Sequence, residues 1–382
     1  MKRFAVTLIS LMLFLPVAYG SWLPPLKISE EISLPRPTIA SYGKEIFIFW
    51  KGKNLTYCTI EDKNITSYKV LQGVNVDSYS LYFDGRNFHI LYSSNGSLHY
   101  ISFNKEGHIL RRASLNTISA IEPDLVVDNK GNIHMVWSED RGDGYQIYYG
   151  VKPNETGANF SEKKLTSSNL SSRRPKIGVD GNGFVHILYD EASPNIRRVG
   201  YFEIRGGEVV TEKILKEENA YWTAFDIDKK NILHIVWQDG LCGKANIYYM
   251  EMGQNASSIY KKIISKGDDK KPDIAVDSNG VTHIVWNTDK ELFYARIDEE
   301  KNVKVEKIVS IKDPRYPSIT LDYNLTPYVV FERWEGGEKP YSLYYTYKTG
   351  EEEEKNTPLF SYLPILAIIF VIYIINKTKK KI

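Results

Sequence analysis

A short segment recurs through the middle of the chain, and its period constrains the fold more than any other feature. Each clear copy contains an apolar run, the pattern Asp-x-x-Gly or a close variant, and a second apolar run with histidine near its start. The histidines at positions 89, 134, 186, 234 and 283 place the copies 45 to 52 residues apart. The clear copies are Glu122–Trp137, Arg174–Tyr189, Phe225–Trp237 and Lys271–Trp286, and weaker ones are 80–92, 317–331 and 36–50.

Each copy predicts two β-strands joined by a tight turn. The aspartate can accept hydrogen bonds from nearby backbone N–H groups, and the glycine can adopt a positive φ. Because the second run is apolar on both faces, we expect it to be buried between two layers. A tyrosine-rich strand such as 146–149 and a more polar strand such as 261–264 follow. Four antiparallel strands per repeat are typical of a propeller blade.

The repeat count predicts how the ring closes. Residues 26–348 give about 46 residues for each of seven units, and the seventh unit ends after its third strand, at Tyr347. The segment 26–34 resembles the polar fourth strands and can complete that unit, which removes an exposed sheet edge. We therefore predict an all-β, seven-bladed β-propeller closed by its N-terminal strand. Six or eight blades stay open because the first two units diverge, and a large β-sandwich is the alternative architecture.

The two ends predict export and a membrane anchor. Residues 1–20 have a basic start, an apolar stretch and small residues before a cleavage point, as a signal peptide does. Residues 359–375 carry no charge and would span about 25 Å as a helix. An acidic linker, 351–358, precedes this segment and a basic tail, 376–382, follows it, which favours a cytoplasmic C-terminus. An uncleaved N-terminal anchor and a buried C-terminal helix are the alternatives.

We therefore expect a single-pass protein of the cell membrane with residues 21–350 as its extracellular domain. Eight Asn-x-Ser/Thr sequons in that domain are glycosylation candidates. They are Asn54, Asn64, Asn95, Asn154, Asn159, Asn169, Asn255 and Asn324.

Charge and composition narrow the classes of partner that the protein is expected to bind. Without the six basic residues of the two ends, 43 basic residues face 47 acidic ones, so the exported part is mildly acidic. Nucleic-acid binding needs a basic stripe and is not expected. The chain is rich in lysine, glutamate and isoleucine but has only four glutamines, a bias of hyperthermophile proteins. Cys58 and Cys242 are 184 residues apart. A buried free thiol is favoured over a disulfide, and whether they pair stays open.

The pattern Asp-x-x-Gly-x-x-His-x-Val-Trp, as in 277–286, resembles repeats of sialidase-like (BNR-type) β-propellers of bacterial and archaeal cell surfaces. It is also similar to NHL-type blades, and together with the composition it favours an archaeal source. The resemblance covers residues 26–348 and implies propeller architecture, whereas propellers host many activities. No copy has the serine and tryptophan offsets of a complete Asp-box.

Acidic residues that follow the second strand of the repeats are the candidate ligand-binding site. Loops at that position share the usual binding face of a propeller, so these residues could form an acidic rim that holds a cation or a polar sugar. The alternative is local turn bonding and pairing with neighbouring arginines. The residues are Asp140, Asp190, Asp239, Asp289 and Glu332.

No metal, cofactor or catalytic site is assigned. The repeated histidines belong to separate units, so they are expected to bond the Asp-x-x-Gly turns rather than to bind a metal. Sialidase chemistry implies three arginines, a Tyr–Glu pair and an acid. Arg36, Arg174 and Arg315 stand at repeat starts, but no Tyr–Glu pair can be assigned. Trp222 and Trp334 could stack on sugar rings or pack between blades, and the tripeptide 141–143 matches an adhesion motif that arises easily by chance.

The sequence therefore favours a non-enzymatic, membrane-anchored module that binds or displays a glycan, peptide or protein partner. A sialidase-like glycoside hydrolase and a structural component of the cell envelope are the alternatives. The oligomeric state stays open.

Overall fold

The computed structural model describes residues 20–349 except 31, 33, 156, 158, 195, 241–242 and 337–340. The chain divides into a compact unit, Pro24–Thr346, and a second unit of which residues 20–23 and 347–349 are described. The predicted signal peptide, except its last residue, and the predicted acidic linker, transmembrane helix and basic tail lie outside the described residues. In the part that is described, no helix has the length and hydropathy needed to cross a bilayer.

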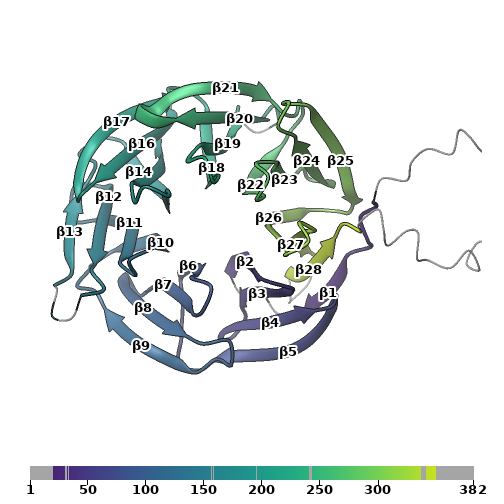
Figure 1. Ribbon diagram of the computed structural model, residues 1–382, viewed down its shortest axis with the longest axis horizontal. Helices are drawn as coiled ribbons and strands as arrows, with labels where there is room; N and C mark the ends of the chain where they lie inside the picture. The colour runs from purple at the N-terminus through teal and green to yellow at the C-terminus, as the bar shows by residue number, and fades with distance from the viewer. Residues whose placement is uncertain are drawn as a thin grey trace, which may run out of the picture. The chain divides into compact units, whose positions relative to one another are not determined.

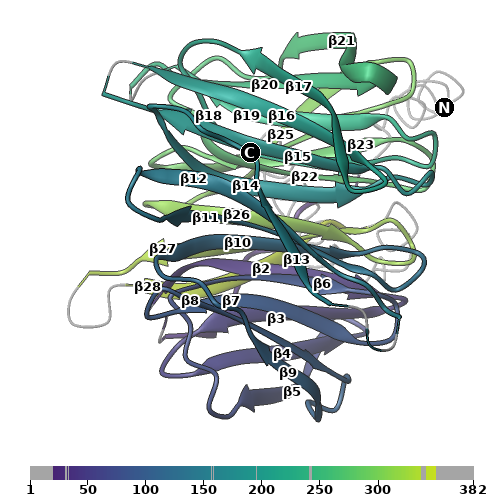
Figure 2. The same ribbon diagram turned by 90° about the vertical axis from the view of Figure 1, so that its left-hand side faces the viewer.

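Seven four-stranded antiparallel sheets make up the unit Pro24–Thr346 (Figures 1 and 2). They are the blades of a β-propeller, which confirms the predicted all-β fold with seven blades. In six blades the strands follow one another in sequence order from the centre outward, so that β2, β6, β10, β14, β18 and β22 lie innermost in Figure 1. In the seventh blade β26 lies innermost and β1 outermost.

The strand bounds follow the repeat. Blades 1 and 2 comprise β2 (Leu34–Tyr42), β3 (Glu45–Lys51), β4 (Leu55–Glu61), β5 (Asn64–Leu71), β6 (Ser78–Phe83), β7 (Phe88–Ser94), β8 (Ser97–Phe103) and β9 (Ile109–Ser114). Blades 3 and 4 comprise β10 (Ala120–Val127), β11 (Ile133–Asp140), β12 (Tyr145–Lys152), β13 (Ser161–Lys164), β14 (Ser171–Val179), β15 (Val185–Ala192), β16 (Arg197–Arg205) and β17 (Glu208–Lys216). Blades 5 and 6 comprise β18 (Ala220–Ile227), β19 (Leu233–Asp239), β20 (Asn246–Gly253), the short 3-10 turn η1 (Gln254–Ala256), β21 (Ser257–Ile263), β22 (Lys270–Val276), β23 (Thr282–Asn287), β24 (Glu291–Ile297) and β25 (Val303–Ser310). Blade 7 comprises β26 (Pro314–Leu321), β27 (Pro327–Trp334), β28 (Tyr341–Tyr347) and β1 (Leu26–Ser29).

The N-terminal strand closes the ring, as predicted. β1 pairs antiparallel with β28, with Leu26 opposite Tyr345. The strand is shorter than the predicted segment 26–34, because it ends at Ser29 and Leu34 already opens β2 of blade 1. The chain must pass from the outer edge of blade 7 to the centre of the ring within these residues, so they cannot all belong to one strand.

The second strand of each blade is buried, as its apolar pattern predicted. All residues of β23, for example, are buried. Neighbouring blades share their core: Val236 and Tyr249 of blade 5 pack with Ile284 and Trp286 of blade 6. Burial of each such side chain contributes roughly 1.5–3 kcal/mol. Cys58 is a buried free thiol whose pKa burial raises to about 12, and Cys242 lies outside the described residues.

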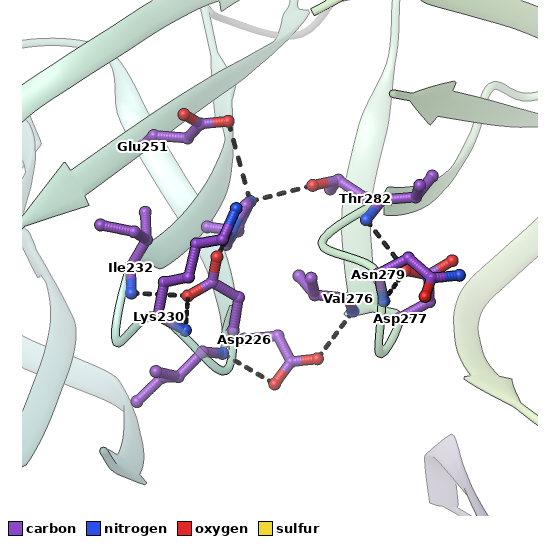
Figure 3. A network of polar contacts seen from close by, with 12 residues as sticks. Asp226, Lys230, Ile232, Glu251, Val276, Asp277, Asn279 and Thr282 are labelled. Carbon is purple, nitrogen blue, oxygen red and sulfur yellow. Dashed lines mark hydrogen bonds and ion pairs between the residues drawn. The ribbon is translucent and has the colours of Figure 1, made fainter. Parts of the chain in front are cut away.

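A buried Asp–His–Tyr chain recurs in the five blades that carry the repeated histidine. In blade 5 the turn carboxylate of Asp228 accepts the N–H groups of Lys230 and Ile232, both at 2.8 Å (Figure 3). The imidazole Nδ1 contacts a tyrosine hydroxyl at 2.6–2.8 Å, and Nε2 faces the turn aspartate at 2.9–3.6 Å. The chains are Asp84–His89–Tyr100, Asp128–His134–Tyr149, Asp180–His186–Tyr201, Asp228–His234–Tyr249 and Asp277–His283–Tyr294.

These chains join the second and third strands of a blade to the turn that precedes the second strand, and some continue into the next blade. The His234 Nδ1 atom lies 2.9 Å from Thr282 Oγ1 of blade 6 and 4.0 Å from Glu251 Oε1 of blade 5 (Thr282 and Glu251 are labelled in Figure 3). Asp226 accepts the N–H of Val276 in the next blade at 2.8 Å. The repeated histidines therefore serve the blades, and the described residues contain no cluster of three or more metal-ligating side chains.

Candidate functional site: the mouth of the central channel

The innermost strands of six blades contain a bulge near their start. At each bulge the pairing with the second strand shifts register, and one non-glycine residue adopts a φ between 48° and 86°. A left-handed backbone costs an ordinary residue roughly 1–2 kcal/mol, and such strain is concentrated at functional sites. The six residues, called here the mouth residues, are Arg36, Glu122, Arg174, Trp222, Lys271 and Tyr316.

Side chains of the preceding blade hold five of these backbones in place. The N–H of Arg36 donates to Glu332 Oε1 at 2.7 Å, and that of Trp222 donates to Asp190 Oδ2 at 3.0 Å. The N–H groups of Glu122, Arg174 and Lys271 donate to Ser78, Glu122 and Gln238 at 2.9–3.3 Å. The strained residues are therefore fixed by neighbours on another blade, so the bulges depend on the assembled ring.

The mouth residues all line one cavity of about 590 Å³ at the centre of the propeller. Blade 2 is the exception among the described blades, because β6 pairs with β7 without a register shift. Its wall of the cavity consists of Asp77, Ser78, Tyr79 and Ser80, and the Tyr79 hydroxyl donates to the carbonyl of Phe49 at 3.1 Å. Blade 2 therefore contributes no left-handed mouth residue to the cavity.

Cations and aromatic rings from five blades meet in the cavity. The guanidinium carbons of Arg36 and Arg174 each lie 4.9 Å from the Trp222 ring centre. Lys271 Nζ lies 3.4 Å from the ring centre of Tyr316 and 5.5 Å from that of Trp222. The two aromatic rings are 5.8 Å apart and nearly perpendicular. The rings hold three cations in place by cation–π attraction.

The cations differ in how far they are neutralised. Arg174 Nε is 2.7 Å from Asp190 Oδ2, and Arg36 Nη2 is 3.5 Å from Glu122, which also pairs with Arg173 at 2.9 Å. Among the described residues, no carboxylate forms an ion pair with Lys271. Burial, together with the nearby Arg315 and Arg36, lowers the pKa of Lys271 to about 8. This ammonium group is therefore the cation of the mouth that most lacks a counter-charge.

Glu332 lies beneath this cluster and is fully buried. Its Oε2 has no hydrogen-bond partner, and burial raises its pKa to about 8, although the Arg36 N–H and the charges of Lys271 and Arg315 oppose the shift. At neutral pH Glu332 is mainly protonated, so it does not cancel the charge of Lys271. At the mouth, Arg36 and Arg173 therefore pair with Glu122, and Arg174 pairs with Asp190, whereas Lys271 forms no ion pair among the described residues.

Deeper acidic side chains of the cavity are used by the fold. Asp124 Oδ2 accepts the N–H of Ile177 at 3.1 Å, and Asp273 Oδ2 accepts the N–H of Ile319 at 3.0 Å and the hydroxyl of Ser318 at 2.8 Å. Both join one blade to the next. The free hydrogen-bonding capacity of the cavity therefore lies with the cations above them, and this arrangement suits an anion.

The structure distributes the five residues of the predicted acidic rim over two kinds of position. Asp190 and Glu332 are buried and anchor mouth residues. Asp140 accepts the N–H groups of Gly142 and Gly144 within its own hairpin, and Asp239 and Asp289 face Lys216 and Lys270 at 3.6 and 2.8 Å.

Sequence reasoning had singled out Arg36, Arg174 and Trp222, but for other reasons, and it missed Glu122, Lys271 and Tyr316 as site residues. A signal was present: in five blades the left-handed residue is followed directly by proline. Proline lacks an N–H and is tolerated in strands mainly at bulges and edges. A repeated proline preceded by a variable residue therefore marks the bulge.

The other sequence candidates have partners outside the mouth residues. Arg315 forms two hydrogen bonds with Asp313, at 2.8 and 2.9 Å, and one with the Tyr341 hydroxyl. In the tripeptide 141–143, Arg141 pairs with Glu139 and Glu162, and Asp143 pairs with Lys164. Of the residues at the mouth that the structure describes, Tyr316 has ring contacts but no hydrogen bond to a glutamate. The Tyr–Glu pair of sialidase chemistry is therefore not seen there.

No protein-family model matches the chain, and no curated protein matches it in sequence. The fold is similar to that of solved propellers. One is from the hydrazine synthase of Kuenenia stuttgartiensis, at 11% identity and a TM-score of 0.58, covering 82% of this chain and 96% of that one. An ulvan polysaccharide lyase bound to -[GlcA(1-4)Rha3S]- is 11% identical with a TM-score of 0.57, covering 87% and 96%. The Dos1 propeller is 10% identical with a TM-score of 0.54, covering 87% and 96%. At these identities the likeness shows a shared fold.

Proposed function

We propose that the protein is a binding module whose partner carries an anionic group and docks at the channel mouth. One observation carries the proposal: Lys271 lies against the face of Tyr316 without a carboxylate partner among the described residues, beside Arg36 and Trp222. A partly buried charge without a counter-ion is costly, and an incoming anion relieves that cost. The left-handed backbones fix these side chains in advance, so little further ordering is needed on binding.

The same arrangement favours binding over catalysis. Hydrolysis of a glycoside needs an acid and a nucleophile on either side of the scissile bond. The mouth offers cations and rings, its Glu122 is paired with Arg173, and Glu332 is enclosed beneath the cluster. The sialidase-like alternative has no specific observation in its favour.

The sequence adds a location to the proposal. An export signal at residues 1–20 and a single membrane span at 359–375 would hold the propeller outside the cell as part of a single-pass membrane protein. None of the eight candidate glycosylation sites, all of them described residues, lines the cavity. Glycans at these positions would leave the mouth open to a partner.

The proposal is tested by binding to defined polyanions. Full-length protein in mild detergent is titrated with polygalacturonate, dextran sulfate, polyglutamate and neutral dextran, and affinity is measured by calorimetry. We expect at least one polyanion to bind and neutral dextran not to bind. Lys271→Met keeps the aliphatic stem but removes the charge, and should weaken binding about tenfold, the value of one charge-assisted hydrogen bond.

Lys163→Met is the matched control, because Lys163 lies on the outermost strand β13 and pairs with Glu208. It should bind as the unmodified protein does. Absence of binding to all three polyanions, or an equal loss in both variants, contradicts the proposal.

A further inference from the structure

Three arginine–tyrosine stacks lie next to the mouth residues. Each includes the residue directly before a mouth residue: Arg173, Tyr221 or Arg315. Arg173 lies 4.7 Å from the ring centre of Tyr145, Arg315 lies 5.5 Å from that of Tyr341, and Arg197 lies 4.6 Å from that of Tyr221. Of these residues Arg173 lines the cavity, and the other two stacks adjoin mouth residues in the sequence through Tyr221 and Arg315.

Two of the stacks lie on widely separated parts of the ring. Arg173–Tyr145 joins blades 4 and 3, whereas Arg315–Tyr341 belongs to blade 7, and in Figure 1 β14 and β26 face each other across the centre. Trp334 extends the second stack, with its ring 5.1 Å from that of Tyr341 and 37% of its surface exposed. A ligand that reaches both stacks must pass over the mouth.

The three places share one arrangement, although Arg173 is also paired with Glu122 and Arg315 with Asp313. Each combines a cation with the face of an aromatic ring: Lys271 with Tyr316 at the mouth, Arg173 with Tyr145 on one side and Arg315 with Tyr341 on the other. Arg173 and Arg315 each keep about a third of their side-chain surface exposed. Aromatic faces suit the apolar faces of sugar rings, and guanidinium groups suit carboxylates and sulfates.

We infer that the ligand is an acidic polysaccharide that crosses this face of the propeller, with one charged sugar at the mouth and further ones at the two flanking stacks. The inference rests on the proposed function and gives it a ligand class. A repeated anionic sugar matches a repeated cation–ring pair, whereas a single anion would use the mouth alone.

Chain length tests this inference. Full-length protein is titrated with di-, tetra- and octagalacturonate, and affinity is expressed per uronate unit, so that a merely statistical gain is removed. We expect affinity per unit to rise at least tenfold from the dimer to the octamer, because simultaneous contacts act as linked sites.

Two variants test which residues cause the rise in affinity with chain length. Trp334→Ala and Tyr145→Ala should each remove most of the length dependence, while affinity for the dimer stays within about twofold. Lys271→Met should weaken the dimer and the octamer alike. Each variant is compared with the unmodified protein by thermal unfolding, so that a misfolded variant is recognised, and Lys163→Met serves again as the control.

The outcomes separate the inference from the proposed function. Equal affinity per unit for all lengths overturns the polysaccharide path but leaves anion binding at the mouth in place. If polyglutamate binds but no uronate oligomer does, the polysaccharide path is likewise overturned and anion binding at the mouth stays in place. Failure of every anion to bind overturns both, and a rise with length that survives both flanking variants overturns the assigned path.

Discussion

The Asp–His–Tyr chains and the mouth residues are both repeated around the ring, but they are repeated in different ways. In the chains the side chains recur and make the same contacts in five of the seven blades. At the mouth the backbone bulge recurs, whereas the side chains are arginine, glutamate, tryptophan, lysine and tyrosine. A side chain that recurs from blade to blade supports the blade. A recurring backbone that carries different side chains forms an asymmetric surface, which is what recognition requires.

The largest expected effect comes from opening the ring on which both regions depend. Deletion of Leu26–Ser29 removes the outermost strand of blade 7 and leaves the β28 edge unpaired. We expect loss of the cooperative thermal transition and of anion binding together, measured by circular dichroism and calorimetry. Lys27→Ala in the same strand removes only a partly exposed ion pair and is the control. A deletion variant that melts cooperatively at the original temperature would show that closure by β1 is not required.

The second-largest expected effect distinguishes the Asp–His–Tyr chains from the mouth residues. His234→Ala removes the contacts of the imidazole with Tyr249 and Thr282 and leaves a buried cavity beside a tyrosine hydroxyl. We expect a loss of about 2–4 kcal/mol in the free energy of unfolding with unchanged affinity for polyanions. His108→Ala, on an exposed loop, should change neither. A binding defect in His234→Ala at a temperature where it is folded would break the distinction between supporting and recognising residues.

A pH-dependent effect is expected at Glu332, which anchors the mouth residue Arg36. The pKa of Glu332 is raised from 4.5 to about 8, so its contribution to stability is complete below pH 4.5 and is lost as the pH rises through 8. Glu332→Gln keeps an acceptor for the Arg36 N–H but cannot ionise. We expect equal stability at pH 4 and a growing advantage of the variant up to pH 8, of at most about 1.4 kcal/mol per pH unit. Thermal melts of the unmodified protein and of Glu332→Gln from pH 4 to 9 measure this difference in stability. If the stability of both proteins changes with pH in the same way, the raised pKa of Glu332 is refuted.

The smallest effect concerns the outer carboxylates. Asp289 is largely exposed, and its partner Lys270 also pairs with Asp268 at 2.9 Å. Asp289→Asn should therefore change stability by less than about 0.5 kcal/mol and leave the affinity for polygalacturonate unchanged. A change in affinity of more than about twofold would place the acidic hairpins in the binding site.

Particular residues show how much of the fold and of the candidate site could be predicted from the sequence. The turn at Asp128 and the histidine beside it are six residues apart, and their contact depends on two adjoining strands. Local pairing of this kind leaves a repeated pattern in the sequence, so the blades, their number and the histidine role were predictable. Arg36 and Trp222 were recognised separately, as a family-like arginine and as a loop aromatic. Their contact at 4.9 Å joins residues 186 positions apart on blades 1 and 5, and no local pattern records it.

The sequence by itself determined the seven-bladed propeller, the closing strand and the supporting role of the histidines, because each depends on short-range periodicity and on turns. The tertiary structure alone decided which side chains share the mouth, that Lys271 lacks a counter-charge among the described residues, and that Asp190 and Glu332 anchor the bulges. The physical reason is that the mouth exists only when the ring is closed. Closure brings side chains from separate blades within contact distance, and the differences between the side chains leave no repeat in the sequence.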